Sequence, residues 1–379
     1  METLKSKQKH FDFGFLLIVL ALIAFGLVMV FSSSSEAARV NHGDALYFIK
    51  RQTAWAIISI FCMFVTSGID YRRYKKLSKP AMGLAFILLV AVLIVGVEIN
   101  GGKRWLDLKV IGFQPSEVAK LALILFFANG LSGNGKQLKR FGTGFLPYIC
   151  ILGIIAILLL AEPHMSATVV IVLIGVAMLF AAGAKISHLA LIGSLGFGAG
   201  IALIFSSPYR LQRLTSFQDP FKDILGDGWQ IVQSLYAIGS GGLFGVGFGR
   251  SRQKFLYIPE PHNDFIFSII CEELGYIGAV AVIFMFAILI FKSVMIAINA
   301  PDKFGSLVAT GITTLVAVEM IINVLVVTST MPVTGMALPF FSYGGTSLLM
   351  HAVAMGIMLN ISKHTTKPSG VELKNKNPK

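Results

Sequence analysis

Long apolar runs separated by short polar segments dominate the sequence. A helix that spans a bilayer needs about 20 mostly apolar residues. Ten runs come close to that length, and we predict a transmembrane helix for each of them: residues 13–32, 52–69, 80–98, 115–131, 144–161, 165–183, 187–206, 265–291, 304–328 and 344–362. The pattern therefore predicts an all-α, polytopic membrane protein with ten transmembrane helices and one long loop, residues 207–263, between helices 7 and 8.

Composition supports this class. Of the 379 residues, 55% are hydrophobic and 13% are charged, whereas soluble proteins average about 25% charged residues. The net charge of +13 does not indicate nucleic-acid binding, because the lysines and arginines lie in short segments between apolar runs. The three cysteines lie in apolar runs without metal or redox spacing, and we interpret them as buried small hydrophobic residues: Cys62, Cys150 and Cys271.

The basic residues predict the orientation in the membrane. With ten spans both termini lie on one side, and the segments on that side hold 19 of the 32 lysines and arginines, against 12 on the other side. By the positive-inside rule both termini are cytoplasmic, and loop 207–263 is extracytoplasmic. We divide the chain into a cytoplasmic N-terminus (1–12), a membrane domain (13–362) and a lysine-rich, disordered cytoplasmic tail (363–379).

The long loop ends in the segment with the most candidate chemistry. Residues 229–235 are amphipathic and suited to lie along the membrane interface. Six glycines follow between 239 and 249, but they follow no predicted strand and match no nucleotide-binding pattern. A long loop without regular structure is uncommon unless it forms a binding or active-site element.

Asp264 stands where this loop enters the eighth span. It could cap the helix, or it could act as a general base at the membrane surface. With Glu260 and His262 it could also bind a divalent cation, although this spacing is weak evidence for metal. Glu272 and Glu273 follow inside the span, where a carboxylate costs roughly 3 kcal/mol or more and is a functional candidate by default.

Two polar pairs lie inside other predicted spans. Glu117 and Lys120 share one helix face, either as a mutually neutralising ion pair or as the lining of a polar cavity beside Asp264. Glu319 and Asn323 also share a face, and we expect an interhelical hydrogen bond from them.

Cations and one tryptophan collect in the predicted extracytoplasmic segments. Trp105 is either an interfacial belt residue or part of a site. Arginine and lysine pair strongly with phosphate, so the cations suit a lipid pyrophosphate. These cations are Lys103, Arg104, Arg210, Arg213, Arg250, Arg252 and Lys254.

Several motifs resemble the SEDS family of shape, elongation, division and sporulation proteins. They are Asn100–Trp105, Phe113–Glu117, Pro259–Gly275, Pro332–Gly335 and Leu338–Ser347, and the similarity extends from about Phe13 to Ser362. The segments Arg250–Phe255 and Pro332–Gly335 are closer to the division and sporulation branch than to the elongation branch. One departure is His164, which stands where many members carry an acidic residue.

The resemblance implies a ten-span peptidoglycan glycosyltransferase that polymerises lipid II at the outer face of the bacterial cytoplasmic membrane. It implies a partner, a class B penicillin-binding protein that acts as transpeptidase. Its essential aspartate corresponds to Asp264, which we expect to be catalytic and to hold any Mg²⁺ or Mn²⁺ ion. We expect the substrate to contact Lys103, Arg104, Trp105, Glu117, Lys120, Arg210, Arg213, Arg250, Lys254, His262 and Ser342.

Two other functions remain open at this level. A transporter that flips lipid II would suit polar pairs inside spans, and it predicts a continuous polar path through the bilayer. A non-catalytic scaffold of the division machinery would leave Asp264 as a simple helix cap.

The orientation can be tested by labelling. With the three native cysteines replaced, a Lys222→Cys variant should react with a membrane-impermeant thiol reagent in intact cells, because loop 207–263 is predicted to be outside. Labelling that occurs only after lysis would contradict the orientation.

Overall fold

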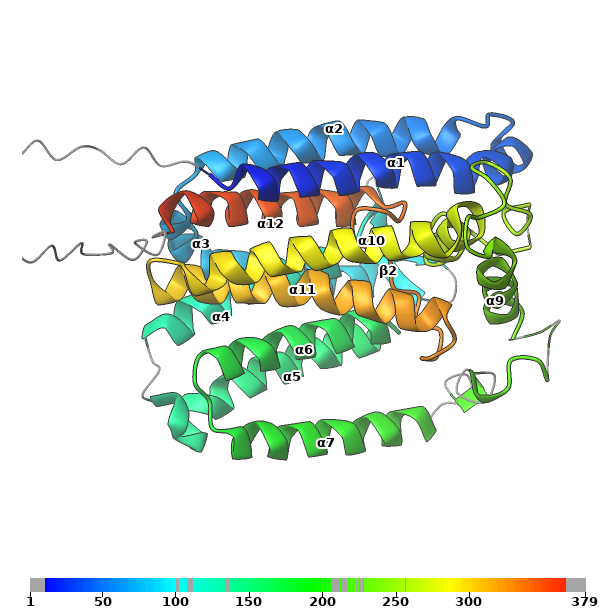
Figure 1. Ribbon diagram of the computed structural model, residues 1–379. Helices are drawn as coiled ribbons and strands as arrows, with labels where there is room; N and C mark the ends of the chain where they lie inside the picture. Colours follow the sequence, from blue (N-terminus) through cyan, green and yellow to red (C-terminus); the bar gives the residue numbers. More distant parts are fainter. Residues whose placement is uncertain are drawn as a thin grey trace, which may run out of the picture.

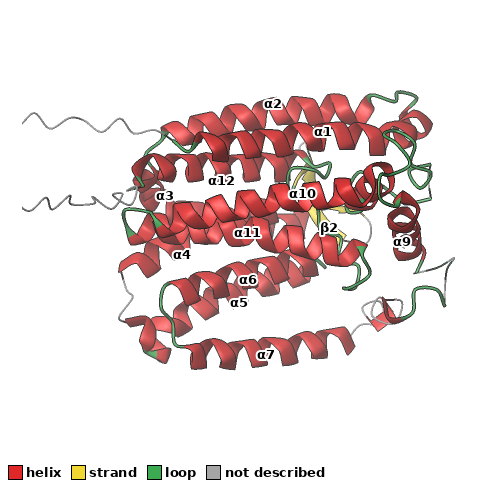
Figure 2. Cartoon of the chain, in the orientation of Figure 1, coloured by secondary structure: helices red, strands yellow, loops and turns green. Residues whose placement is uncertain are grey.

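The protein is a bundle of long helices in the computed structural model (Figures 1 and 2). The structure describes residues 11–99, 102–107, 112–133, 137–205, 211–212, 217–222, 224, 226, 228–255 and 257–365. Most of the tail predicted to be disordered, residues 366–379, therefore lies outside the described part.

A helix overlaps each of the ten predicted spans. The helices are α1 (Phe13–His42), α2 (Tyr47–Gly68), α3 (Tyr74–Val95), α4 (Pro115–Gly133), α5 (Leu146–Ala161), α6 (Met165–Ala181), α7 (Ile186–Phe205), α10 (Ile266–Ile298), α11 (Lys303–Val327) and α12 (Gly345–His364). Short helical turns precede α3 and α5: η1 (Tyr71–Arg73), η2 (Gln137–Lys139) and η3 (Phe141–Phe145). In the described residues, eight helices are long and apolar enough to cross a membrane, whereas α6 and α7 have shorter apolar stretches. The multi-pass helical fold is confirmed, and the count of ten spans stays a prediction.

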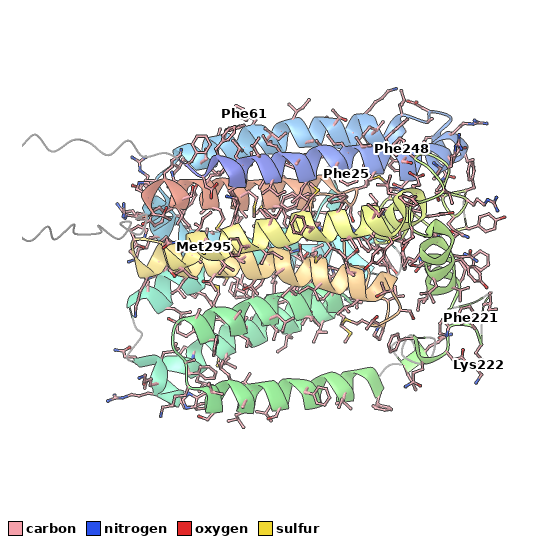
Figure 3. All side chains as sticks on the ribbon, in the orientation of Figure 1. Phe25, Phe61, Phe221, Lys222, Phe248 and Met295 are labelled. Atoms are coloured by element: carbon pink, nitrogen blue, oxygen red, sulfur yellow. The ribbon has the colours of Figure 1, made fainter. Side chains whose placement is uncertain are left out.

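The bundle has a buried centre and an apolar exterior. Helices α4, α11 and α12 bury most of their residues. Helices α2, α3 and α7 lie at the periphery (Figure 1). Phe61 of α2 is 68% exposed and points away from the bundle in Figure 3, whereas Phe25 packs inward against Phe341. An exposed apolar exterior of this kind suits contact with lipid.

A small antiparallel sheet corrects the expectation of a purely helical fold. Strands β1 (Val97–Ile99), β2 (Gly102–Asp107) and β3 (Gly112–Phe113) form it in the order β1-β2-β3. It occupies the segment between α3 and α4, where the sequence predicted only a loop. Because β2 carries Lys103, Arg104 and Trp105, the sheet holds these residues at the end of the bundle opposite the start of α1 and the end of α12 (Figure 1). We call it the outer end, because it is the end predicted to face the outside.

Helix α10 is interrupted at Gly275, whose φ of 66° and ψ of −167° are not helical. A break leaves backbone groups without their partners in the helix, and such groups are costly in an apolar surrounding. The glycine segment 241–247 supplies partners. Val246 and Gly247 donate to the carbonyls of Glu272 and Glu273 at 2.9 and 3.1 Å. In the other direction, the carbonyls of Gly242 and Leu243 accept from Tyr276 and Ile277 at 2.8 and 3.2 Å.

The amphipathic stretch of the long loop forms helix α9 (Trp229–Gly241), which lies crosswise at one end of the bundle (Figure 1). It docks on protein, because Ile231 and Val232 are buried, and its position along the membrane interface stays a prediction. Ser234 completes the contact. Its hydroxyl oxygen lies 2.6 Å from that of Ser268 in α10, and it donates to the carbonyl of Val327 at the end of α11 at 2.7 Å.

The bridging of α10 by segment 241–247 can be tested at Gly245. This residue has a φ of +80°, and a Cβ there would lie 2.1 Å from the carbonyl oxygen of Glu273. We expect Gly245→Ala to cost more than about 2 kcal/mol of stability and to lower the thermal unfolding midpoint of purified protein. Gly239→Ala is the matched control, because nothing lies within 4 Å of a Cβ there. Equal midpoints for the two variants would contradict the bridging role.

Candidate active site

Asp264 lies immediately before α10, at the outer end of the bundle. The N-cap position belongs to Phe265, so Asp264 is one residue outside the helix and the capping interpretation loses its basis. Its side chain is partly exposed. A partly exposed carboxylate at this position can meet a ligand.

Two other outer segments hold the backbone around Asp264. The hydroxyl of Ser342 donates to the carbonyl of Asn263 at 2.7 Å, and the backbone N–H of Tyr343 donates to the carbonyl of His262 at 2.9 Å. The side chain of Asn323, near the end of α11, donates to the carbonyl of Asp264 at 2.8 Å. Ser342, predicted to contact substrate, thus also ties the last loop to the Asp264 segment.

The predicted cation site is not assembled in the described residues. His262 is 3% exposed and its ring centroid lies 4.3 Å from that of Phe48, while Glu260 is exposed and bonds Asn263 at 2.8 Å. Burial lowers the pKa of His262 to about 4, so the ring is neutral at pH 7. No three His, Cys, Asp or Glu side chains of the described chain form a metal-binding group. A Mg²⁺ or Mn²⁺ ion at Asp264 would complete its coordination with other oxygen ligands, such as water or the substrate.

A cluster of charged side chains lies buried inside the bundle. The Lys120 ammonium is 2.7 Å from a Glu117 oxygen and 2.5 Å from an oxygen of Glu319 on α11. The other Glu319 oxygen is 2.8 Å from Nε2 of His351 on α12. All four side chains are at most 9% exposed. The predicted Glu117–Lys120 pair is therefore part of a larger network that joins α4, α11 and α12.

His351 completes this network. Its Nδ1 lies 2.8 Å from the carbonyl oxygen of Ser347 and its Nε2 lies 2.8 Å from Glu319. A carbonyl oxygen only accepts hydrogen bonds, so Nδ1 donates to Ser347. Lys120 thus lies between two carboxylates, and one of them, Glu319, also contacts His351. The sequence analysis missed His351, although a histidine within an apolar span is itself a signal.

Glu272 and Glu273 anchor the loop that follows the glycine segment. Glu273 is 0% exposed and accepts from the Ser32 hydroxyl of α1 at 2.6 Å. Glu272 accepts from the hydroxyl of Ser251 at 2.5 Å and from the backbone N–H of Arg252 at 2.8 Å. These contacts explain two carboxylates in an apolar helix as structural supports.

The sequence analysis counted Lys254 among the outer cations available to a pyrophosphate. Lys254 does not lie on the outer surface, so that placement is wrong. Its side chain is 4% exposed and its ammonium is 3.1 Å from Glu273. The same ammonium donates to the carbonyl of Gly249 at 2.7 Å. An ion pair to a fully buried carboxylate holds Lys254 inside the protein, because separating the two would leave an unpaired buried charge.

The other predicted cations differ in accessibility. Lys103 and Arg250 are exposed. Arg104 and Trp105 are partly buried on β2, and the Arg104 guanidinium donates to the carbonyl of Pro163 at 2.5 Å. Arg210 and Arg213 lie outside the described residues.

The turn between α5 and α6 adds a polar side chain, Glu162, that the sequence analysis did not single out. Glu162 is 0% exposed, and neither of its oxygens has a hydrogen-bond partner within the described chain. Burial raises its pKa to about 8, with Arg104 opposing. Burial, followed by the Arg104 and Lys120 charges, lowers the pKa of His164 to about 3. Both side chains are thus mainly uncharged at pH 7, beside the Arg104 strand.

The same turn contacts the segment between α11 and α12. The hydroxyl of Ser166 donates to the carbonyl of Thr334. Gly335 of that segment lies against the Asp264 side chain, so the start of α6 is linked to the surroundings of Asp264. These features define a polytopic membrane protein with a carboxylate site at the outer end of a charge-stabilised bundle.

Comparison with known proteins gives the family. A family model described as cell cycle protein FTSW_RODA_SPOVE matches residues 13–367. Stage V sporulation protein E of Bacillus subtilis is 42% identical over 95% of this chain and 99% of its own length. A probable peptidoglycan glycosyltransferase FtsW of Trichlorobacter lovleyi is 43% identical over 93% of both chains. The chain belongs to the FtsW/RodA/SpoVE family.

Solved structures agree with this assignment. A chain from a structure on the coordination of polymerization and crosslinking by a peptidoglycan synthase complex superposes with a TM-score of 0.78 at 28% identity, covering 93% of this chain and 98% of that one. The rod shape determining protein RodA of Thermus thermophilus gives a TM-score of 0.70 at 26% identity, covering 94% and 98%.

The charge network predicts unequal effects of its members on stability. Lys120→Ala leaves two carboxylates facing only His351, and we expect a loss of about 3–5 kcal/mol, as for breaking other buried ion pairs. Glu117→Ala leaves Lys120 paired with Glu319 and should cost less. Thermal unfolding of the purified variants measures both losses. A Glu117→Ala loss as large as that of Lys120→Ala would contradict the network.

Proposed function

We propose that this protein is a peptidoglycan glycosyltransferase that polymerises lipid II into glycan strands at the outer face of the bacterial cytoplasmic membrane. The observation that carries the proposal is Asp264, a partly exposed carboxylate whose backbone is held by two other segments in a member of this family. The relatives named as glycosyltransferases span nearly the whole chain, so the activity would belong to this fold as a unit.

The reaction requires a base and stabilisation of a leaving group. The C4 hydroxyl oxygen of an acceptor sugar attacks the anomeric carbon of the donor, and the bond from that carbon to the donor's pyrophosphate breaks. Asp264 takes the hydroxyl proton, so a glycosidic bond forms and undecaprenyl pyrophosphate departs with the electron pair. A general base must be in its ionised form before it takes the proton.

The departing pyrophosphate carries negative charge that cations can stabilise. Lys103 and Arg250 are exposed at the outer end, and Arg104 lies on the same strand as Lys103. Arginine can also contact a phosphate through two parallel hydrogen bonds. We assign charge stabilisation to these three residues and leave Lys254, which is committed to Glu273, out of the site.

The two alternatives lose support at specific residues. A flippase needs a polar path, but the intramembrane charges of Lys120, Glu319 and His351 are engaged with one another. A scaffold would use Asp264 as a helix cap, but Phe265 occupies the cap position. Catalysis is therefore the role that best accounts for both features.

We further propose that both termini are cytoplasmic and that the protein acts with a class B penicillin-binding protein. Support for a transpeptidase partner comes from the structural neighbour, whose printed description joins polymerization and crosslinking in one complex. The relatives named FtsW and stage V sporulation protein E favour septal wall synthesis, in division or in spore formation.

The substitution Asp264→Asn tests the assignment. Asparagine keeps the size of the side chain and much of its hydrogen bonding, but it cannot take a proton. We expect glycan polymerisation from labelled lipid II, measured in detergent with the partner protein, to fall by a factor on the order of 100 or more.

Detergent removes the distinction between two membrane sides, so this assay does not depend on flipping. Binding of the partner and the thermal unfolding midpoint serve as controls for folding and should match the parent protein. Full polymerisation by Asp264→Asn would refute the catalytic assignment.

A further inference from the structure

Asn323 makes two hydrogen bonds that join separate outer segments. Its side-chain Nδ2 donates to the backbone carbonyl of Asp264 at 2.8 Å and to the carbonyl of Met336 at 2.6 Å. The residue is 1% exposed and lies one turn before the end of α11. One buried amide group thus links the start of α10 to the segment between α11 and α12.

The chemistry of a primary amide makes this link rigid. The group has two N–H donors in one plane, and here each donor is directed to a different carbonyl. Both distances are in the range of good hydrogen bonds. Because the two donors share one nitrogen, the two carbonyls are held at a fixed separation.

The separation of these two carbonyls determines how close the backbone around Met336 lies to the Asp264 carboxylate. Gly335, the neighbour of Met336, has a φ of +68°, and a Cβ built there would lie 3.2 Å from Oδ2 of Asp264. The carboxylate therefore packs directly against the backbone of this segment. A change in the distance between Asp264 and Met336 would move the carboxylate relative to this backbone segment.

The buried charge network in turn fixes where Asn323 stands. Glu319 precedes it by four residues, one turn along α11, and is held by Lys120 of α4 and His351 of α12. Three helices thereby set the position and rotation of α11 below the amide. These contacts connect the network to the backbone of Asp264.

We propose that Asn323 is a positioning residue that holds Asp264 in the orientation required for proton removal from the acceptor. This inference rests on the proposed function, because it takes Asp264 as the base. Asn323 itself does not contact the reacting atoms in this assignment. Small displacements of a catalytic group can reduce turnover by about 100-fold, so the loss of a fixed link should appear in the rate of the chemical step.

A second buried asparagine provides a matched control. Asn360 of α12 is 3% exposed, donates to the carbonyl of Ser67 at 2.8 Å and accepts from the backbone N–H of Tyr71 at 2.8 Å. It also joins two segments through two hydrogen bonds, but at the opposite end of the bundle. Asn360→Ala therefore reproduces the structural loss without touching the Asp264 segment.

The experiment compares Asn323→Ala, Asn323→Ser and Asn360→Ala in lipid II polymerisation, with the intact chain and its partner in detergent. Rates are expressed per folded molecule, and thermal unfolding is measured for each variant. For Asn323→Ala we expect kcat to fall by about 10-fold or more while KM changes by less than about two-fold. Asn323→Ser keeps one donor, so its kcat should lie between those of the parent and of Asn323→Ala. Asn360→Ala should lose stability but keep its kcat.

Three results would overturn the proposal in favour of a purely structural link. They are an unchanged kcat in Asn323→Ala, an equal fall of kcat in Asn360→Ala, or failure of both Asn323 variants to fold. A parent protein without polymerase activity in the same assay would count against the proposed function instead, which separates the two conclusions.

Discussion

The structure depends on satisfying polar groups where α10 is interrupted. At Gly275 the helix loses its regular backbone bonds, and in the same turn it carries two fully buried carboxylates. The segment 241–247 supplies the missing backbone partners, while Ser32 and Lys254 supply donors to Glu273. Neither set of groups could remain unpaired in an apolar bundle, since each would cost several kcal/mol. The long loop is consequently bound to the first and eighth predicted spans.

The same principle organises the centre of the bundle. Lys120, Glu319 and His351 come from three helices, and the Glu319 carboxylate contacts both of the basic side chains. Apolar surfaces alone pack helices without a strong preference for one rotation in a lipid surrounding. Directional ion pairs specify that rotation, because a charged group in the wrong place would have no partner. The geometry of the site at the outer end therefore depends on the charged side chains inside the bundle.

Hydrophobic runs predicted the helices well, but they did not predict where a helix continues through buried polar residues. The first span was predicted to end at Ser32, whereas α1 continues to His42. Ser32 lies inside the protein, where its hydroxyl donates to Glu273. A run of apolar letters cannot reveal the Gly275 break, which depends on a partner segment 30 residues earlier. Asp264, Glu117 and Lys120 were predictable as unusual charges and as family motifs. The burial of Lys254 and the roles of His351 and Glu162 follow from tertiary contacts, which no local pattern encodes.

The Gly275 break also divides α10 into two parts, and the length of the second part can be compared with the thickness of a membrane. The part of α10 after it, residues 276–298, rises about 34 Å at 1.5 Å per residue, close to the hydrocarbon thickness of a bilayer, about 30 Å. If residues 276–298 are the part that spans the bilayer, the ten residues before the break would lie in the headgroup layer, with Asp264 just beyond them. A lipid-linked substrate carries its pyrophosphate in that same layer. Such a substrate would reach the carboxylate by lateral diffusion, without any part of its polyprenyl tail leaving the bilayer.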